Sequence, residues 1–316
     1  MTGDPLGPRL SPDALEAAAA LERILPRPFH VLGVERARAV AAGLRPEGPP
    51  ESIAETRPLT LVGRNGTIPA RLYRPDTESA LPIAVYLHGG GWTVGSLDGI
   101  DPVCRALANR SGCAVVSIDY RLAPEHKFPT PLHDCLDSVE YLIRHEAELG
   151  LDAGRIALVG DSAGGNLAAG VAIACRGGTG PSIAGLVLAY PAVEYGVIRP
   201  SWVEYADGPL ITTADVDWFW RNYFRDKRDH ANPLAVPSAA ASLAGLPPSL
   251  VITAAVDPLR DGAEAFARRL QEDGGQATIL RYDGVFHGFF TELGTFAASD
   301  AAASEAARFL KSILTT

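Results

Sequence analysis

Short, almost continuous apolar runs alternate along most of the chain with longer stretches of helical periodicity. The apolar runs predict buried strands near residues 83–88, 114–119, 156–159, 185–190, 249–254 and 278–282. The intervening and final stretches predict helices near residues 99–110, 131–147, 164–175, 260–272 and 298–314. This alternation favours right-handed crossovers and a mostly parallel sheet with helices on both faces. We therefore expect an α/β fold with a mostly parallel central sheet.

The first part of the chain does not follow this alternation. Residues 12–24 are rich in alanine and predict a helix. A proline-rich passage, 46–50, separates this region from two short strands at 59–62 and 69–73, which predict a hairpin across Asn65-Gly66. We expect this antiparallel hairpin at one edge of the sheet.

The alternation also stops between about residues 196 and 237. Many of the chain's aromatic residues gather in this stretch: Trp202, Tyr205, Trp218, Phe219, Trp220, Tyr223 and Phe224. One interpretation is a helix that buries an aromatic face in the core. The other is a cap, built together with the N-terminal helices, that covers an active site. The two interpretations are compatible because a cap helix must also pack onto something.

Ser162 occupies the most informative position for chemistry. It lies between two spaced glycines, Gly160 and Gly164, after an apolar run and before a helix of small residues. A serine in a tight turn between strand and helix is typical of the nucleophile elbow of serine hydrolases. The glycines are needed because the strand and the helix approach each other closely. The N-terminal N–H groups of the new helix would lie beside an oxyanion.

The other parts of a catalytic triad follow in the expected order. Upstream, the strand near 83–88 runs into three glycines between His88 and Trp92, which can offer bare N–H groups to an oxyanion. Downstream, Asp257 follows one strand and His287 follows the next. Serine, acid, histidine is the chain order of the α/β-hydrolase triad. For the acid, Asp261 and Asp283 are rivals, and Asp257 lies closest to a strand end.

With these motifs the sequence resembles the hormone-sensitive-lipase-related, or bacterial family IV, carboxylesterases of the α/β-hydrolase fold. The similarity covers roughly residues 55–314 and rests on these segments: His88–Trp92, Asp119–Glu125, Gly160–Gly164, Asp257–Asp261 and His287–Phe289.

The resemblance implies a role for each motif residue. Ser162 would be the nucleophile, His287 the base and Asp257 the acid. The oxyanion hole would be formed by the amides of three residues: Gly89, Gly90 and Ala163. The residues expected to line the substrate pocket are Trp92, Tyr195, Trp202 and Phe286. His88 is expected to brace the glycine loop, and no catalytic step is expected of Asp161.

The resemblance also favours the cap over the core interpretation. It implies a cap formed by residues 1–50 and 196–237. The α/β-hydrolase core would then comprise residues 51–195 and 238–316.

Composition and charge narrow the range of partners. The chain has 316 residues, 47% of them hydrophobic and 21% charged, as in an ordinary globular protein. The net charge of −9 argues against nucleic acid or an anionic membrane as a partner. No apolar run approaches the length of a membrane-spanning helix, and the N-terminus lacks the pattern of a secretion signal. The four cysteines predict free packing thiols. We expect a cytoplasmic protein.

The expected activity is hydrolysis of short- to medium-chain acyl esters through an acyl-enzyme, without a cofactor or metal. Amidase, lactonase or acyltransferase chemistry on the same triad stays open, because all of them share the acyl-enzyme. A ligand-binding, receptor-like protein is the alternative from another class, although relatives of that kind lose a triad member. Members of the family often dimerise through a sheet edge or a C-terminal helix, which makes a homodimer the oligomer that the resemblance suggests.

Overall fold

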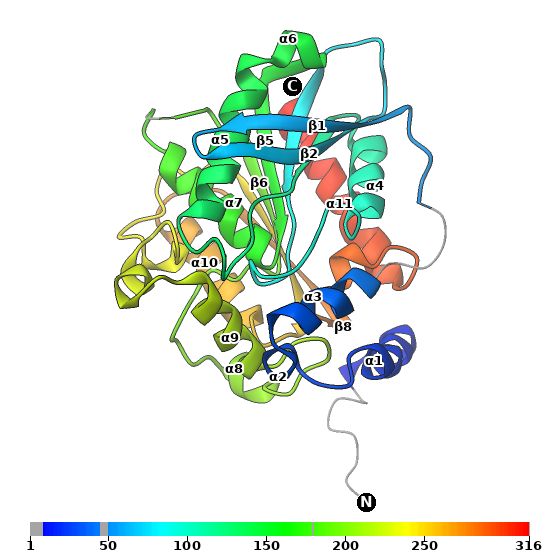
Figure 1. The fold of residues 1–316 in the computed structure, drawn as a ribbon, viewed down its shortest axis with the longest axis vertical. Helices are drawn as coiled ribbons and strands as arrows, with labels where there is room; N and C mark the ends of the chain where they lie inside the picture. The colour runs from blue at the N-terminus through cyan, green and yellow to red at the C-terminus, as the bar shows by residue number, and fades with distance from the viewer. Residues whose placement is uncertain (1–8, 45–49, 179, 316) are drawn as a thin grey trace, which may run out of the picture.

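The chain folds around one large sheet with helices on both sides (Figure 1). The structure is a computed structural model that describes residues 9–44, 50–178 and 180–315. Residues 1–8 and most of the proline-rich passage, 45–49, therefore lie outside the described residues.

The sheet has the strand order β1-β2-β4-β3-β5-β6-β7-β8, eight strands among the described residues. β1 pairs with β2 and β2 with β4 in antiparallel fashion, and all other neighbours are parallel. The predicted α/β class is confirmed, and the predicted hairpin lies at the sheet's edge. The strands are β1 (Glu55–Gly63), β2 (Gly66–Arg74), β3 (Leu81–Leu87), β4 (Ala114–Ile118), β5 (Leu151–Asp161), β6 (Gly185–Ala189), β7 (Ser249–Val256) and β8 (Ala277–Phe286).

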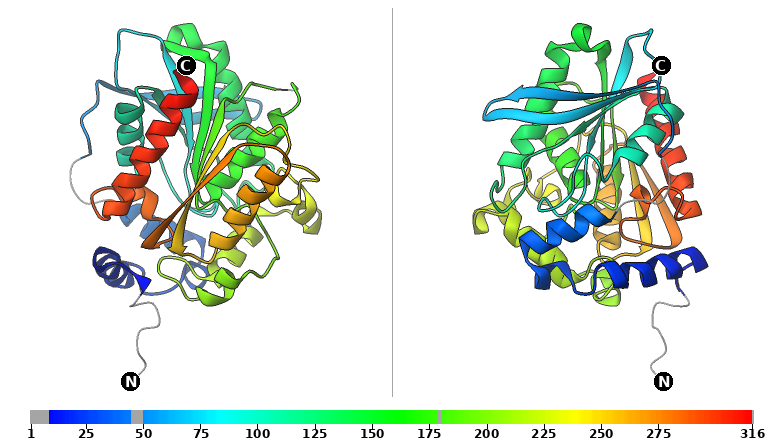
Figure 2. Two further views of the ribbon diagram at one scale, coloured as in Figure 1. Left: turned by 180° about the vertical axis from the view of Figure 1, so that it is seen from behind. Right: turned by 45° about the vertical axis from the view of Figure 1, so that its right-hand side comes forward.

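Helices cover both faces of the sheet, as Figure 2 shows from two further sides. Successive residues of β3 alternate between two buried clusters: Val85 and Leu87 belong to one, Ala84 and Tyr86 to the other. A strand that is apolar at every position is what a parallel strand between two helical layers requires. The first cluster includes residues of α5 (Thr130–Arg144), α7 (Ala163–Cys175) and α10 (Arg260–Glu272). The second includes residues of α4 (Asp101–Ser111) and α11 (Ala297–Leu314).

The predicted elements differ from the observed ones mainly at their ends. The hairpin turn is Arg64-Asn65 and not Asn65-Gly66, because Gly66 already pairs with Gly63 in the ladder. The helix predicted over 131–147 ends at Arg144, and a short helix, α6 (Glu146–Leu149), follows after His145. The central strand β5 begins several residues earlier than the apolar run predicts.

Two segments far apart in the sequence lie together at one end of the molecule, at the bottom of Figure 1. The N-terminal segment contributes α1 (Pro12–Ile24), α2 (Phe29–Leu32) and α3 (Val34–Gly43). The other segment contributes α8 (Pro200–Glu204) and α9 (Thr213–Tyr223). The short helices η2 (Lys227–Ala231) and η3 (Pro237–Ala239) follow α9 in the chain.

Both polar and aromatic contacts join these two segments. Nδ1 of His30 lies 2.8 Å from Oδ1 of Asp215, and the ring centroids of Phe29 and Phe219 are 5.7 Å apart. Asp215 also belongs to the capping box that begins α9, which holds its carboxylate in place. The contacts link α2 directly to α9.

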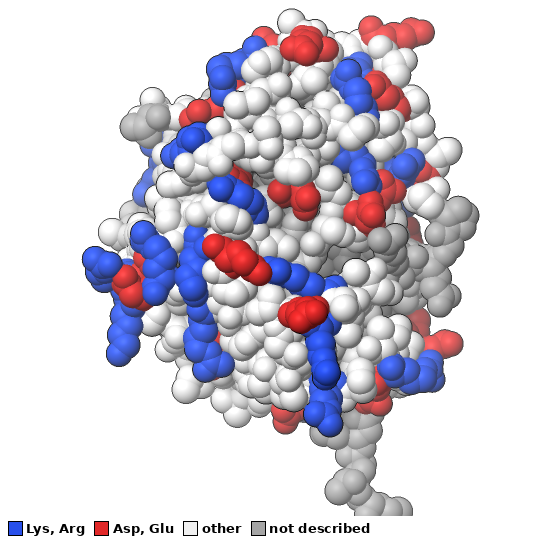
Figure 3. Space-filling view, in the orientation of Figure 1, with Lys and Arg blue, Asp and Glu red and all other residues white. Residues whose placement is uncertain are grey.

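Charged side chains of both signs are interspersed over the face drawn in Figure 3. Several arginines of the molecule form ion pairs with neighbouring acids, for example Arg38 with Glu125 at 2.6 Å and Arg225 with Asp229 at 2.7 Å. The four cysteines are buried and free, as predicted. In the part of the chain that the structure describes, no helix has the length and apolar character needed to cross a membrane.

Candidate active site

Ser162 lies in a strained turn between the end of β5 and the start of α7. Its φ is 52° and its ψ −116°, a conformation that residues other than glycine rarely adopt. The Ser162 N–H donates a hydrogen bond of 2.8 Å to the Ala189 carbonyl of β6, which holds the turn in place. The backbone thus lifts this side chain out at the carboxyl end of the sheet, where open α/β sheets bind ligands.

The glycines beside Ser162 are required by close approach of the backbone. A Cβ at Gly164 would lie 1.9 Å from the carbonyl oxygen of Leu87, and one at Gly160 would lie 2.3 Å from the carbonyl oxygen of Gly164. Any side chain at either position would push α7 away from the sheet. The spacing seen in the sequence therefore has a packing cause.

The structure brings Ser162, His287 and Asp257 together in one chain of hydrogen-bonding contacts. Nε2 of His287 lies 3.0 Å from Oγ of Ser162, and Nδ1 of His287 lies 2.8 Å from Oδ2 of Asp257. Both His287 and Asp257 are buried. The other carboxylate oxygen, Oδ1 of Asp257, accepts the N–H of Leu259 at 2.8 Å. With its oxygens held in this way, the carboxylate can orient the imidazole so that Nε2 accepts the serine proton.

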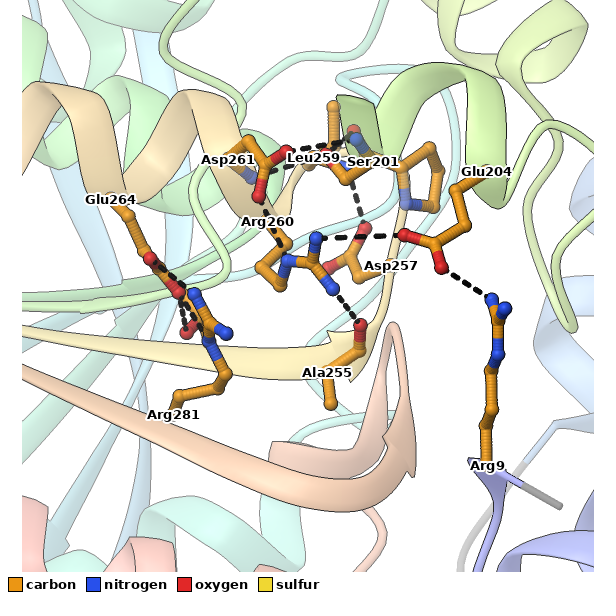
Figure 4. A network of polar contacts seen from close by, with 12 residues as sticks. Arg9, Ser201, Glu204, Ala255, Asp257, Leu259, Arg260, Asp261, Glu264 and Arg281 are labelled. Carbon is orange, nitrogen blue, oxygen red and sulfur yellow. Dashed lines mark hydrogen bonds and ion pairs between the residues drawn. The ribbon is translucent and has the colours of Figure 1, made fainter. Parts of the chain in front are cut away.

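The two rival acids have other surroundings. Oδ2 of Asp261 accepts the N–H of Ser201 in α8 at 2.8 Å, and its Oδ1 accepts Nε of Arg260 at 2.9 Å. Figure 4 shows Asp261 turned toward α8, within a polar network that also contains Asp257. Asp283 is exposed, and no contact with His287 is found among the described residues.

The same network ties the loop after β7 to the end of the molecule formed by the N-terminal segment and α8. Arg260 donates to the Ala255 carbonyl at 2.7 Å and lies 3.8 Å from Glu204, which pairs with Arg9 at 2.5 Å (Figure 4). The Ser201 hydroxyl donates to the Pro258 carbonyl at 3.1 Å. The loop that carries Asp257 is thereby fixed from outside the sheet.

The glycine run after β3 reaches the same site but differs from the prediction in one residue. The Gly89 N–H donates a hydrogen bond of 2.9 Å to Oδ1 of Asp161, so it is already used inside the protein. Among the described residues no acceptor is found for the N–H of Gly90 or of Ala163. Gly89 is therefore a wrong choice for an oxyanion donor. Gly91, which the sequence did not single out, lines the same cavity.

Asp161 and His88 hold the glycine run in place. Oδ1 of Asp161 also accepts the Tyr86 hydroxyl at 2.9 Å, and burial raises the pKa of this carboxyl above its usual range. The His88 ring stacks on Tyr120 with centroids 4.4 Å apart, and its Nδ1 lies 2.7 Å from the Gly89 carbonyl. Burial lowers the pKa of His88, which favours its neutral form. These contacts give both residues a bracing position.

Arg38 of α3 adds a clamp from the N-terminal segment. Its Nε donates to the Thr93 carbonyl at 2.9 Å, and its Nη2 donates to the Ala123 carbonyl at 3.0 Å. Glu125 holds the other side of the guanidinium at 2.6 Å. Thr93 directly follows the glycine run and Trp92, so α3 is tied to the loop that faces Ser162.

A cavity of about 560 Å³ contains Ser162 and His287 in its wall. Of the four predicted pocket residues, Trp92 and Phe286 line it. Tyr195 and Trp202 do not, and they line a smaller cavity beside it. The Tyr195 ring packs against aromatic residues instead, with centroids 5.6 Å from Trp220 and 5.0 Å from Phe224.

The sequence did not identify many of the individual residues that form the apolar wall. They come from both segments at the bottom of Figure 1: Leu21, Ile24, Phe29, Leu44, Leu210, Ile211, Val216 and Phe219. The aromatic stretch near 218–224 was the available signal, but it does not tell which rings face the cavity. The site thus combines a serine at hydrogen-bond distance from a histidine with a largely apolar chamber. This arrangement could support acyl transfer from a small apolar molecule.

Comparison with known proteins relates the chain to esterases. A family model described as the alpha/beta hydrolase fold matches residues 84–291. The chain is 41% identical over 249 residues to the carboxylic ester hydrolase LipN of Mycobacterium tuberculosis. This alignment covers 76% of this chain and 65% of LipN, so the chain spans slightly under two thirds of the length of LipN. It is 36% identical over 242 residues to an arylesterase of Saccharolobus solfataricus, covering 76% and 79% of the two chains. A solved hyperthermophilic esterase from the archaeon Pyrobaculum calidifontis has a TM-score of 0.88 at 40% identity, covering 98% of this chain and 100% of that one.

Proposed function

Because the chain belongs to the α/β-hydrolase family, in its hormone-sensitive-lipase-like branch, we propose that it is a carboxylesterase acting through Ser162, His287 and Asp257. The observation that carries this proposal is the continuous chain of contacts from Asp257 through His287 to Ser162 in the wall of a cavity. A serine hydroxyl needs a base at hydrogen-bond distance to become an effective nucleophile, and His287 lies at that distance.

In the proposed reaction, Oγ of Ser162 attacks the ester carbonyl carbon while Nε2 of His287 accepts the hydroxyl proton. Asp257 orients the imidazole and stabilises the imidazolium that forms. The tetrahedral intermediate collapses as His287 gives its proton to the leaving alcohol, and the acyl group stays on Ser162. Water then attacks the acyl carbon, with His287 as base, and releases the carboxylic acid and the free serine.

The negative oxygen of the tetrahedral intermediate needs fixed donors. We assign this role to the N–H groups of Gly90 and Ala163, which come from the glycine run and from the first residue of α7. Gly89 has no part in this assignment because its N–H bonds to Asp161. Its role is to hold the run at the correct distance from the turn at Ser162.

We further propose that residues 1–50 and 196–237 act as a cap over a core of residues 51–195 and 238–316. In support, the apolar wall of the cavity draws on both cap segments, and the pair of His30 and Asp215 joins them. A chamber of about 560 Å³ suits esters with short to medium acyl chains.

The experiment that tests the proposed function measures hydrolysis of p-nitrophenyl esters from acetate to palmitate by wild type and Ser162→Ala. We expect the highest kcat/KM at short to medium chains and a loss of at least about a thousandfold in the variant. Folded wild-type protein that hydrolyses none of these esters, or a Ser162→Ala variant of equal activity, would overturn the proposal.

The remaining expectations on partners and location belong to the same proposal. Small esters are the proposed substrates, with no nucleic acid or membrane partner, and the net charge of −9 supports the exclusion of polyanions. The four free, buried thiols are compatible with the reducing cytoplasm. A homodimer is the proposed oligomer, and light scattering during gel filtration would test it directly.

A further inference from the structure

Glu292 places a carboxyl group in the wall of the cavity that contains Ser162 and His287. It follows the short helix η4 (Phe289–Thr291), in the loop that leads from His287 to α11. Its neighbours Thr291 and Thr295 line the same cavity. A substrate bound for attack by Ser162 therefore shares its chamber with this carboxyl group.

The carboxyl of Glu292 is without a partner within the described part of the chain. No described residue donates a hydrogen bond to this carboxyl group, and no described lysine, arginine or histidine lies within ion-pair distance of it. Burial raises the pKa of Glu292 to about 7. Several other enclosed carboxylates of the molecule have a basic partner: Asp257 with His287, Asp215 with His30, Asp134 with Arg121 and Glu264 with Arg281. Because this half-buried carboxyl lines the cavity and has no partner among the described residues, it is available to bind a group of the ligand.

The charges around the cavity favour a positively charged partner. Among the described residues that line it, Arg23 is the only lysine or arginine, and its side chain is exposed. Asp13 and Glu16, from the same helix α1, add acidic groups to this lining. A cleft with an acidic lining and apolar walls attracts cations and concentrates its field inside.

We propose that Glu292 forms a subsite for an ammonium group, so that the enzyme prefers esters that carry a basic amine on their acyl or alcohol arm. This inference rests on the proposed esterase function and adds a substrate class to it. The apolar wall would hold the methylene chain of such an arm, and the carboxylate would accept hydrogen bonds from its ammonium end. An amine brought by the substrate supplies the partner that the protein lacks.

The test compares esters that differ only in a terminal ammonium or methyl group. Ethyl 6-aminohexanoate and ethyl heptanoate form the pair for the acyl arm, and 5-aminopentyl butanoate and hexyl butanoate form the pair for the alcohol arm. Hydrolysis is followed by titration of the released acid at about pH 8, where the amines are protonated. The readout is the ratio of kcat/KM for the ammonium ester to that for its methyl partner, in wild type, Glu292→Gln and Glu22→Gln.

We expect at least one of the two ratios to fall by about tenfold or more in Glu292→Gln. We expect both ratios to keep their wild-type values in Glu22→Gln, where an exposed carboxylate of α1 outside the cavity lining is lost. Equal ratios in wild type and Glu292→Gln would overturn the inference while leaving the esterase proposal intact. So would a better rate for ethyl 6-hydroxyhexanoate than for the ammonium ester. If folded wild type hydrolyses neither methyl ester, the esterase proposal itself has failed.

Discussion

The backbone N–H of Gly89 donates a hydrogen bond of 2.9 Å to Oδ1 of Asp161, the residue directly before Ser162. This bond joins the glycine run after β3 to the end of the neighbouring strand β5. The Tyr86 hydroxyl donates to the same oxygen at 2.9 Å. One buried carboxylate thus accepts hydrogen bonds from the Gly89 N–H and from the Tyr86 hydroxyl. The proposed oxyanion donors therefore keep a constant position relative to the proposed nucleophile.

Replacing Asp161 by alanine would leave two buried donors without an acceptor. An unsatisfied buried donor costs about 1–3 kcal/mol, so we expect Asp161→Ala to lose about 2–6 kcal/mol of unfolding free energy and to reduce kcat by about tenfold or more. Asp161→Asn keeps an oxygen at this position, and we expect it to retain most of both quantities. Urea unfolding and ester hydrolysis measure these effects. An alanine variant with wild-type stability and kcat would contradict this role.

Arg38 should matter for catalysis although it lies outside the cavity. Arg38→Ala removes the donors to the carbonyls of Thr93 and Ala123. The loop that carries the glycine run is then no longer attached to α3 by these hydrogen bonds. We expect kcat/KM for a short ester to fall by about tenfold, since loss of precise positioning is costly. Arg36→Ala, an exposed arginine on the same helix, is the matched control. Equal losses of kcat/KM in the two variants would show that the hydrogen bonds of Arg38 do not contribute specifically to catalysis.

The choice of acid can be tested with two nearby aspartates, Asp257 in the loop after β7 and Asp261 in the first turn of α10. Asp257→Asn should lower kcat by about ten-thousandfold, because the carboxylate that orients His287 is lost. Asp261→Asn should cost less than about tenfold, since Asp261 bonds to Ser201 and Arg260 and not to His287. Steady-state kinetics of both variants, with circular dichroism as a check of folding, decides the matter. A larger loss in the Asp261 variant would reverse the assignment.

Glu292 should make the stability of the protein depend on pH. Its pKa of about 7 in the folded state lies above the ordinary value of 4.5, so the folded state retains this proton longer than the unfolded one. Stability is therefore lost as the pH rises from about 4.5 to 7. We therefore expect the unfolding free energy of Glu292→Gln to exceed that of wild type by up to about 3 kcal/mol at pH 8 and by almost nothing at pH 4.

Chemical unfolding of wild type and Glu292→Gln at both pH values measures this difference. The other titratable or charged groups that share the cavity lining are Asp13, Glu16, Arg23, His88, Asp161, Tyr190 and His287, and all are present in both proteins. A difference in unfolding free energy that stays constant between pH 4 and pH 8 would show that Glu292 does not titrate in this range.

The fold was predictable because each central strand is apolar on both faces and ends at a recognisable turn. β3 runs into the glycines, β5 into Ser162, and β7 into Asp257. Chain order and motif spacing then indicated which side chains would meet at the carboxyl edge of the sheet. The element ends were less predictable, because the start of β5 depends on its pairing with β3 and not on an apolar run.

Other features depend on side-chain directions that a single sequence does not contain. The Gly89 N–H is occupied only because the Asp161 side chain turns toward it from the next strand. The family resemblance implied that Tyr195 lines the pocket, but its ring packs on Trp220 and Phe224. Glu292 lies in a loop without periodicity, so neither its burial nor its missing partner could be inferred from the sequence.

The most direct test of the account is to detect the acyl-enzyme. Wild type is mixed with excess p-nitrophenyl butanoate, quenched with acid within the first turnover, and analysed by intact-mass and peptide-mass spectrometry. We predict a butanoyl group on Ser162 in wild type, a burst of p-nitrophenol with it, and neither in Ser162→Ala. Turnover without acylation of Ser162, or acylation of another residue at the rate of turnover, would contradict the account.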